Sequence, residues 1–189
     1  MVAIMQRRDF IKRVGLGALA FTVGGSEVML TPREAYAQNV PLKTLTADEG
    51  KTLEAVGETL LPGAAHAGIV HFVDHQLSVP AEQSFLMARV ANVPPPFINI
   101  YRGGLKAING ASAAMHGKRF EELEAKTQYV FIDTMRQNKI EGWQGPPGPF
   151  VYFLMRHDAV DVVYGTVEGI ESLGTPYMAH ILPPTRWEA

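Results

Sequence analysis

The stretch TADEGKTLEAVGETLLPG, residues 46–63, carries the clearest helix signal in this sequence. Thr46 and Glu49 have the spacing of a capping box, in which each side chain accepts a hydrogen bond from the backbone N–H of the other residue. Apolar residues follow at helical intervals until Pro62 and Gly63 interrupt the pattern. We therefore predict an amphipathic helix that begins after Thr46, with an apolar side made of Leu53, Val56, Leu60 and Leu61.

Similar apolar spacing predicts further helices on the C-terminal side of this stretch. They cover residues 67–78, 82–92, 97–114, 124–137 and 150–164. Gly165 is suited to cap the last of them at its C-terminus. No alternating pattern of useful length predicts a strand, and no sequence repeat is present. The expected fold is all-α, a small helical bundle with an irregular C-terminal tail rich in proline and aromatic residues.

Paired arginines stand close to the N-terminus. Arg7 and Arg8 are followed by Phe10 and Lys12, an order that resembles the twin-arginine motif of export signals. The usual motif has serine or threonine before the pair, where this sequence has Gln6. An ordinary secretory signal that happens to carry several basic residues is the alternative. We expect the twin-arginine form, which takes proteins out of the cytoplasm already folded, and hence a location in the periplasm.

The residues after the arginines complete the pattern of an export signal. A weakly apolar run over residues 14–23 is too short and too rich in glycine to span the roughly 30 Å of a bilayer core. Ala35, Tyr36 and Ala37 have the A-x-A form of a cleavage site. We therefore expect a signal peptide over residues 1–37, cleaved after Ala37, and a single helical domain over residues 38–189.

The composition excludes several classes of function. The chain has 189 residues, a formal net charge of −2 and no cysteine. It therefore has no disulfide, no C-x-x-C-H haem attachment and no thiolate-held iron–sulfur cluster. Its charge offers no footprint for nucleic acid. It also contains no glycine-rich phosphate-binding motif. We expect no catalytic, cofactor-binding or metal-binding residue in this chain.

Two histidines in the helix predicted over residues 67–78 are the strongest alternative to that expectation. His71 and His75 are four residues apart, which places them on one helix face within reach of one metal ion, with Asp74 beside them. A zinc protease would need glutamate directly after the first histidine, where this sequence has Phe72. A helix face with partly exposed histidines is the favoured interpretation.

A run of charged residues on the last predicted helix also allows two interpretations. Arg156, His157, Asp158 and Asp161 could supply an acid–base pair, or could form a solvated face with local ion pairs. The second is the more common use of such a run. We expect a solvated face.

The C-terminal tail is rich in the residue types that dominate protein interfaces. It either contacts a partner or packs back on its own bundle. The residues we assign to a partner interface are Tyr177, Met178, His180, Arg186 and Trp187.

Folded export serves chiefly proteins that receive a cofactor in the cytoplasm. This chain carries no recognisable cofactor motif, so the need to travel folded is expected to belong to a partner. An accessory subunit whose signal takes a cofactor-loaded protein with it satisfies both observations.

A resemblance to a known family gives this partner an identity. The segments RHDAVDVVYG (156–165) and PYMAHI (176–181), with Trp187, resemble the gluconate 2-dehydrogenase subunit 3 family. The segment LTADE (45–49) is similar to the same family. Some members have a longer glycine-rich stretch where this sequence has residues 166–169, which leaves the substrate open.

The resemblance implies a non-catalytic small subunit of a periplasmic dehydrogenase complex. Its partner would be an FAD-containing large subunit of the glucose–methanol–choline type that oxidises a sugar, sugar acid or polyol. A c-type cytochrome with haem c often forms a third subunit, and the twin-arginine translocase would export the complex. The alternatives are a stand-alone periplasmic enzyme or metal-binding protein centred on His71, Asp74 and His75, and an export chaperone that releases its client.

Overall fold

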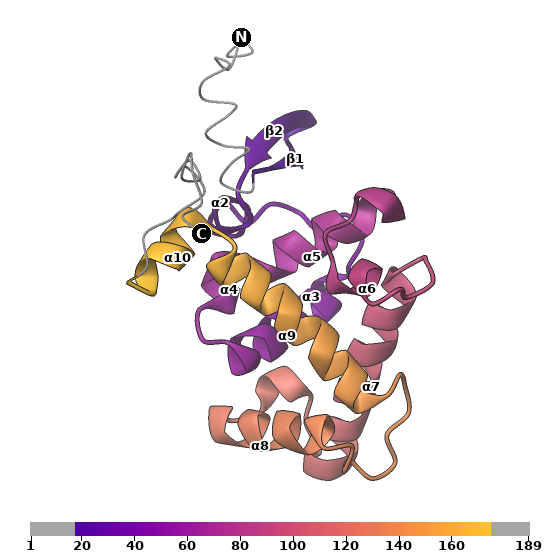
Figure 1. Ribbon diagram of the computed structural model, residues 1–189. Helices are drawn as coiled ribbons and strands as arrows, with labels where there is room; N and C mark the ends of the chain where they lie inside the picture. The colour runs from indigo at the N-terminus through magenta and orange to yellow at the C-terminus, as the bar shows by residue number, and fades with distance from the viewer. Residues whose placement is uncertain (1–17, 175–189) are drawn as a thin grey trace, which may run out of the picture.

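A long helix, α9 (Gly148–Tyr164), lies at the front of the molecule in Figure 1, with α3 (Ala47–Leu60), α5 (Ile69–Ser78) and α7 (Ile98–His116) behind it. The computed structural model describes residues 18–174. Helix α8 (Ala125–Arg136) packs across one end of α9, and α4 (Ala64–Ala67) and α10 (Val167–Ser172) pack near the other. The all-α class predicted from the sequence is confirmed.

The predicted capping box forms at the start of α3. The Thr46 hydroxyl accepts a hydrogen bond from the Glu49 N–H (3.2 Å), and the Glu49 carboxylate accepts one from the Thr46 N–H (2.7 Å). Leu53 and Val56 are fully buried in the main core. This core is formed by one face of each long helix and includes Ile69, Val73, Tyr101, Leu105, Ile108, Phe120, Phe131, Met135, Leu154 and Met155.

The helix predicted over residues 82–92 is wrong. The chain instead forms two short turns, η1 (Ala81–Gln83) and α6 (Met87–Val90). Side chains from elsewhere accept the hydrogen bonds of two backbone N–H groups in this segment: Gln76 accepts from Phe85 (2.8 Å) and Asp158 from Met87 (3.0 Å). A continuous helix here would have to give up these contacts, so tertiary hydrogen bonding outweighs local propensity.

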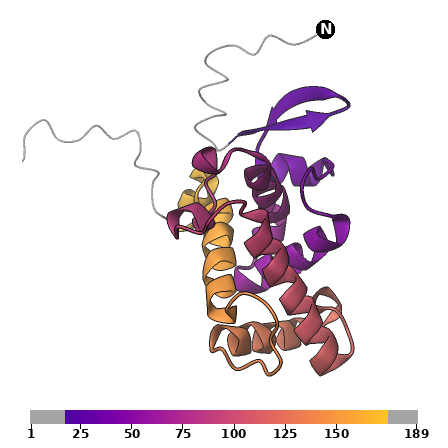
Figure 2. The same ribbon diagram turned by 90° about the vertical axis from the view of Figure 1, so that its right-hand side faces the viewer.

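A β-hairpin, which the sequence did not predict, stands at one end of the molecule (Figure 2). Strands β1 (Leu19–Val23) and β2 (Ser26–Leu30) pair antiparallel. The two-residue turn is Gly24-Gly25, with φ of 57° and 81°, as a primed turn requires. The hairpin leads into α2 (Pro32–Ala37), and together they form a small separate apolar cluster of Phe21, Leu30, Ala35 and Val40.

A short helix, η2 (Phe120–Glu122), lies in the connection between α7 and α8. Within residues 18–174, no helix is both long enough and apolar enough to cross a bilayer.

Candidate functional site

The histidines singled out in the sequence lie on α5. His71 Nε2 contacts the chain itself, whereas Nδ1 of His71 and Nδ1 of His75 are buried without a hydrogen-bond partner among the described residues. The Asp74 carboxylate accepts a hydrogen bond from each of the backbone N–H groups of Lys43, Thr44 and Leu45, at 2.7–2.8 Å. His71 Nε2 lies 2.9 Å from the Val40 carbonyl oxygen, which fits an Nε2–H donor. The His71 and Asp74 side chains are both buried, so the expectation of partly exposed histidines is wrong for His71. His71 and Asp74 therefore fasten the segment that leads into α3 to the surface of α5.

The third member of this set, His75, packs beneath the hairpin. The Phe21 ring centroid lies 5.4 Å from that of His75. Burial lowers the pKa of His75 and the charge of Lys43 adds to this, against a hydrogen bond with the Ala20 backbone and the charge of Asp74. Across the part of the chain that the structure describes, no three histidine, aspartate or glutamate side chains are grouped to hold a metal ion.

The charged run on α9 is divided among separate environments. Asp158 is fully buried and accepts hydrogen bonds from the Tyr101 hydroxyl and the Met87 N–H. Burial raises the pKa of Asp158 to about 7, although both hydrogen bonds act in the opposite direction. Burial and the nearby carboxylate raise the pKa of Tyr101 as well. The expectation of a solvated face is therefore wrong for Asp158, which joins α9 to α6 and α7.

The other charged residues of the run lie outside the buried cluster of Asp158, Tyr101 and Met87. His157 Nδ1 lies 2.7 Å from the Phe153 carbonyl oxygen, one turn back on α9. Asp161 lines a cavity of about 270 Å³ between α2 and the end of α9, and burial raises its pKa. Arg156 is exposed. The structure thus does not assemble these four residues into one acid–base site.

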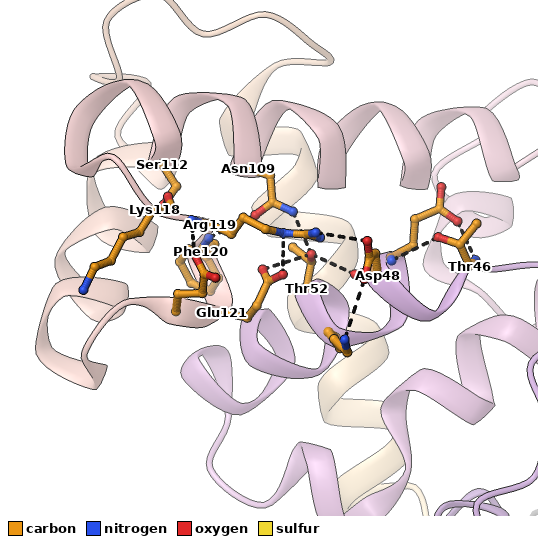
Figure 3. Close-up of polar contacts among 12 residues, drawn as sticks. Thr46, Asp48, Thr52, Asn109, Ser112, Lys118, Arg119, Phe120 and Glu121 are labelled. Atoms are coloured by element: carbon orange, nitrogen blue, oxygen red, sulfur yellow. Dashed lines mark hydrogen bonds and ion pairs between the residues drawn. The ribbon is translucent and has the colours of Figure 1, made fainter.

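A polar network connects α3 to α7 and η2 (Figure 3). Asn109 lies at its centre: its amide nitrogen donates to the Thr52 hydroxyl (2.8 Å), and its amide oxygen accepts from the Phe120 N–H (3.0 Å). Arg119 pairs with Asp48 (3.1 Å) and Glu121 (2.7 Å). Hydrogen bonding to Arg119 lowers the pKa of Asp48. The charges of Arg119, Asp48 and Glu121 are paired with one another. We therefore infer that the role of this network is to hold η2 on the bundle.

Replacing Asn109 with alanine tests this structural role. The variant leaves the Phe120 N–H without its acceptor and Thr52 without its donor, so the free energy of unfolding should fall by about 1–3 kcal/mol. Urea denaturation followed by circular dichroism measures the change. Lys106→Ala is the matched control, because Lys106 is exposed on the same helix, α7. Equal stability of both variants would contradict the role.

An apolar surface faces outward on α9. One side of this helix is buried and includes Val151, Leu154, Met155, Ala159 and Val162. On another side Phe153 is 38% exposed, stacked against Phe150 (6.2 Å between ring centroids) and in contact with His157 (4.3 Å). We call Phe150, Phe153 and His157 the outer face of α9. Apolar side chains on more than one side are typical of a helix that is covered on more than one side.

The segment next to α9 is apolar on its outside too. Phe85 is 64% exposed and Val90 63% exposed, and α6 packs against α9. Large exposed apolar side chains in neighbouring elements are a feature of surfaces that bind other proteins. The outer face of α9 and these two residues are therefore the candidate functional site within residues 18–174. The sequence does not identify them, because the spacing of apolar residues in α9 does not show which sides of the helix are covered.

Several residues assigned from the sequence lie outside the described residues. They comprise the export-signal residues Arg7, Arg8, Phe10 and Lys12, and the tail residues Tyr177, Met178, His180, Arg186 and Trp187. Of the expected cleavage site, Ala35 is fully buried in α2 and Ala37 ends this helix at the surface.

The fold and this surface define a small, largely helical protein that presents an apolar face to solvent. The chain belongs to the gluconate 2-dehydrogenase subunit 3 family, whose model matches residues 47–180. The match extends from the first turn of α3 through α9 and confirms the resemblance identified in the sequence. Neither the curated proteins nor the solved structures contain a match to this chain.

Proposed function

We propose that this chain is the non-catalytic small subunit of a periplasmic dehydrogenase complex. The observation that carries the proposal is the family match over residues 47–180, since the family is described as a subunit of a dehydrogenase. The partner is an FAD-containing large subunit of the glucose–methanol–choline type, and a c-type cytochrome with haem c is a third subunit. Removal of hydride from a sugar, sugar acid or polyol takes place on the flavoprotein, and this chain stabilises and exports it.

The described side chains support a binding role more than a chemical one. The buried polar groups that could have served catalysis are engaged within the fold: Asp74 with backbone N–H groups and Asp158 with Tyr101 and Met87. The exposed apolar residues instead offer a surface for another protein. We propose that the flavoprotein covers the outer face of α9, together with the tail residues assigned from the sequence.

Replacing Arg7 and Arg8 with lysine tests the export part of the proposal. If this chain carries the signal for the whole complex, the double variant should leave the dehydrogenase activity in the cytoplasm, with little in the periplasm. Cell fractionation followed by a dye-linked dehydrogenase assay measures the distribution. The same substitution at Arg89 and Arg136, two exposed arginines on helices, is the control. Normal periplasmic activity of the double variant would exclude the role in export.

Co-purification distinguishes a permanent subunit from a chaperone that releases its client. A permanent subunit should elute with the flavoprotein as one species of constant composition after export. A chaperone should separate from it. Activity of the isolated chain, or a bound metal that requires His71 and His75, would instead favour a stand-alone enzyme or metal-binding protein.

A further inference from the structure

The bond expected to be cleaved, between Ala37 and Gln38, lies inside a folded part of the molecule. Residues 18–40 precede or flank this bond, yet they pack on the bundle as a hairpin followed by α2. Phe21 is 4% exposed and Ala35 is fully buried. The Tyr36 ring packs edge-on against His66 (6.5 Å between centroids) and His71 (6.2 Å). This segment therefore contributes to the structure on both sides of the expected cut.

Helix α2 is held in place by a close contact between two backbones. Pro32 occupies the first turn of α2, and Thr31 and Glu34 form a capping box. The carbonyl group of Pro32 lies against Gly68, where a Cβ atom would overlap it. Gly68 has a φ of 85°, a conformation that glycine adopts at no steric cost. A residue with any side chain at position 68 would push α2 away from α4 and α5.

The backbone on both sides of the bond is engaged in hydrogen bonds. The Gln38 N–H donates to the Glu34 carbonyl (3.0 Å), and the Val40 N–H donates to the Ala35 carbonyl (3.0 Å). The Val40 carbonyl in turn lies 2.9 Å from His71 Nε2. The backbone around the Ala37–Gln38 bond is therefore helical and hydrogen-bonded, not extended.

A protease needs its substrate extended and accessible, so cleavage in a folded region requires local unfolding first. Here that opening would break the hydrogen bonds around the bond and expose the apolar cluster of Phe21, Ala35 and Val40. In folded export, part of the function proposed above, folding precedes translocation. The peptidase outside the cytoplasm would therefore meet this segment already docked.

We propose that docking of α2 on Gly68 protects the Ala37–Gln38 bond, so that the exported subunit keeps its N-terminal segment. The motif A-x-A is then a cleavable sequence that the fold holds in a helical conformation. The subunit in the assembled complex retains the hairpin and α2 as part of its structure, together with the residues that precede them.

Intact-mass spectrometry of the subunit from the periplasmic complex tests this proposal. The expected mass is that of a chain that includes residues 18–37, and a chain beginning at Gln38 would overturn it. Gly68→Ala should yield the chain that begins at Gln38. Gly63→Ala is the matched control, because Gly63 has a similar φ of 95° but no atom within 4 Å of its Cβ position. A Gly68→Ala chain that remains intact would exclude this contact as the source of protection.

A second measurement does not depend on export or on the stability of the variant. Purified signal peptidase is incubated with the full chain and with a synthetic peptide of residues 1–45, which contains the whole export signal but not the bundle on which α2 packs. The peptide should be cleaved after Ala37, and the folded chain should stay intact over the same time. Equal cleavage of both, or of neither, would overturn protection by the fold. Because this assay reads only processing, its outcome is separate from the compartment of the dehydrogenase activity that tests the proposed function.

Discussion

Replacing Asp158 with alanine is expected to lower the free energy of unfolding by about 2–5 kcal/mol, because two buried donors lose their acceptor at once. These donors are the Tyr101 hydroxyl and the Met87 N–H, on α7 and α6. The Tyr101 hydroxyl cannot turn to water, since Tyr101 is 1% exposed and Asp158 is fully buried. Chemical denaturation of the purified chain measures the loss.

The control for this variant is Asp133→Ala. Asp133 lies on α8 and pairs with Arg136, but both side chains are substantially exposed, so its removal should cost less than about 1 kcal/mol. If both alanine variants were equally stable, Asp158 would not be the tie between α9, α6 and α7 that its contacts indicate.

Asp158 also makes stability depend on pH in a direction opposite to that of most carboxylates. Its pKa rises from 3.8 to about 7 on folding, so the folded chain binds the proton more tightly than the unfolded chain. Proton binding by Asp158 therefore stabilises the folded chain fully below about pH 4, and this stabilisation is lost as the pH rises through about 7. The free energy of unfolding should fall by about 4 kcal/mol over this range. Asp158→Asn has no proton to lose, so its stability should change less than that of the wild type over this range.

Replacing Phe153 with aspartate is expected to weaken binding to the flavoprotein by about 30-fold or more, the effect of losing an aromatic hot spot worth about 2 kcal/mol. Phe153 is the exposed centre of the outer face of α9, between Phe150 and His157. A carboxylate there would have to be desolvated against an apolar partner. Titration calorimetry with the purified flavoprotein measures the affinity.

The matched control for Phe153 is Tyr129→Asp. Tyr129 is an exposed aromatic residue on a different helix, α8, and is 67% exposed. Both variants should keep the helical circular dichroism of the wild type, because neither side chain is buried in the core. Weaker binding by the Tyr129 variant, with normal binding by the Phe153 variant, would place the interface on α8.

Local patterns in the sequence were sufficient for the helices whose own residues determine them. Thr46 and Glu49 form the capping box that their spacing predicts, and α9 ends at Gly165 as expected. Residues 82–92 are different, because Gln76 and Asp158 bond to this segment from distant positions. No periodicity within the segment contains that information.

The candidate site was less predictable than the fold, for a related reason. Asp158 stands in a run of charged residues that looks solvated, and only the position of Tyr101 shows that it is buried. Phe153 has the spacing of a core residue, and only the packing of α9 shows which of its sides is left open. The family, in contrast, could be identified from short motifs, since these do not require the third dimension.

The Gly24-Gly25 turn of the hairpin is a position where additional sequence can be inserted. The hairpin projects from one end of the structure (Figure 2). In its turn, a Cβ added at Gly24 or Gly25 would meet no atom within 4 Å. Such an exposed tip accepts inserted sequence without disturbing the bundle. A short epitope or fluorophore-binding peptide could be placed there, and it would label the complex away from the outer face of α9.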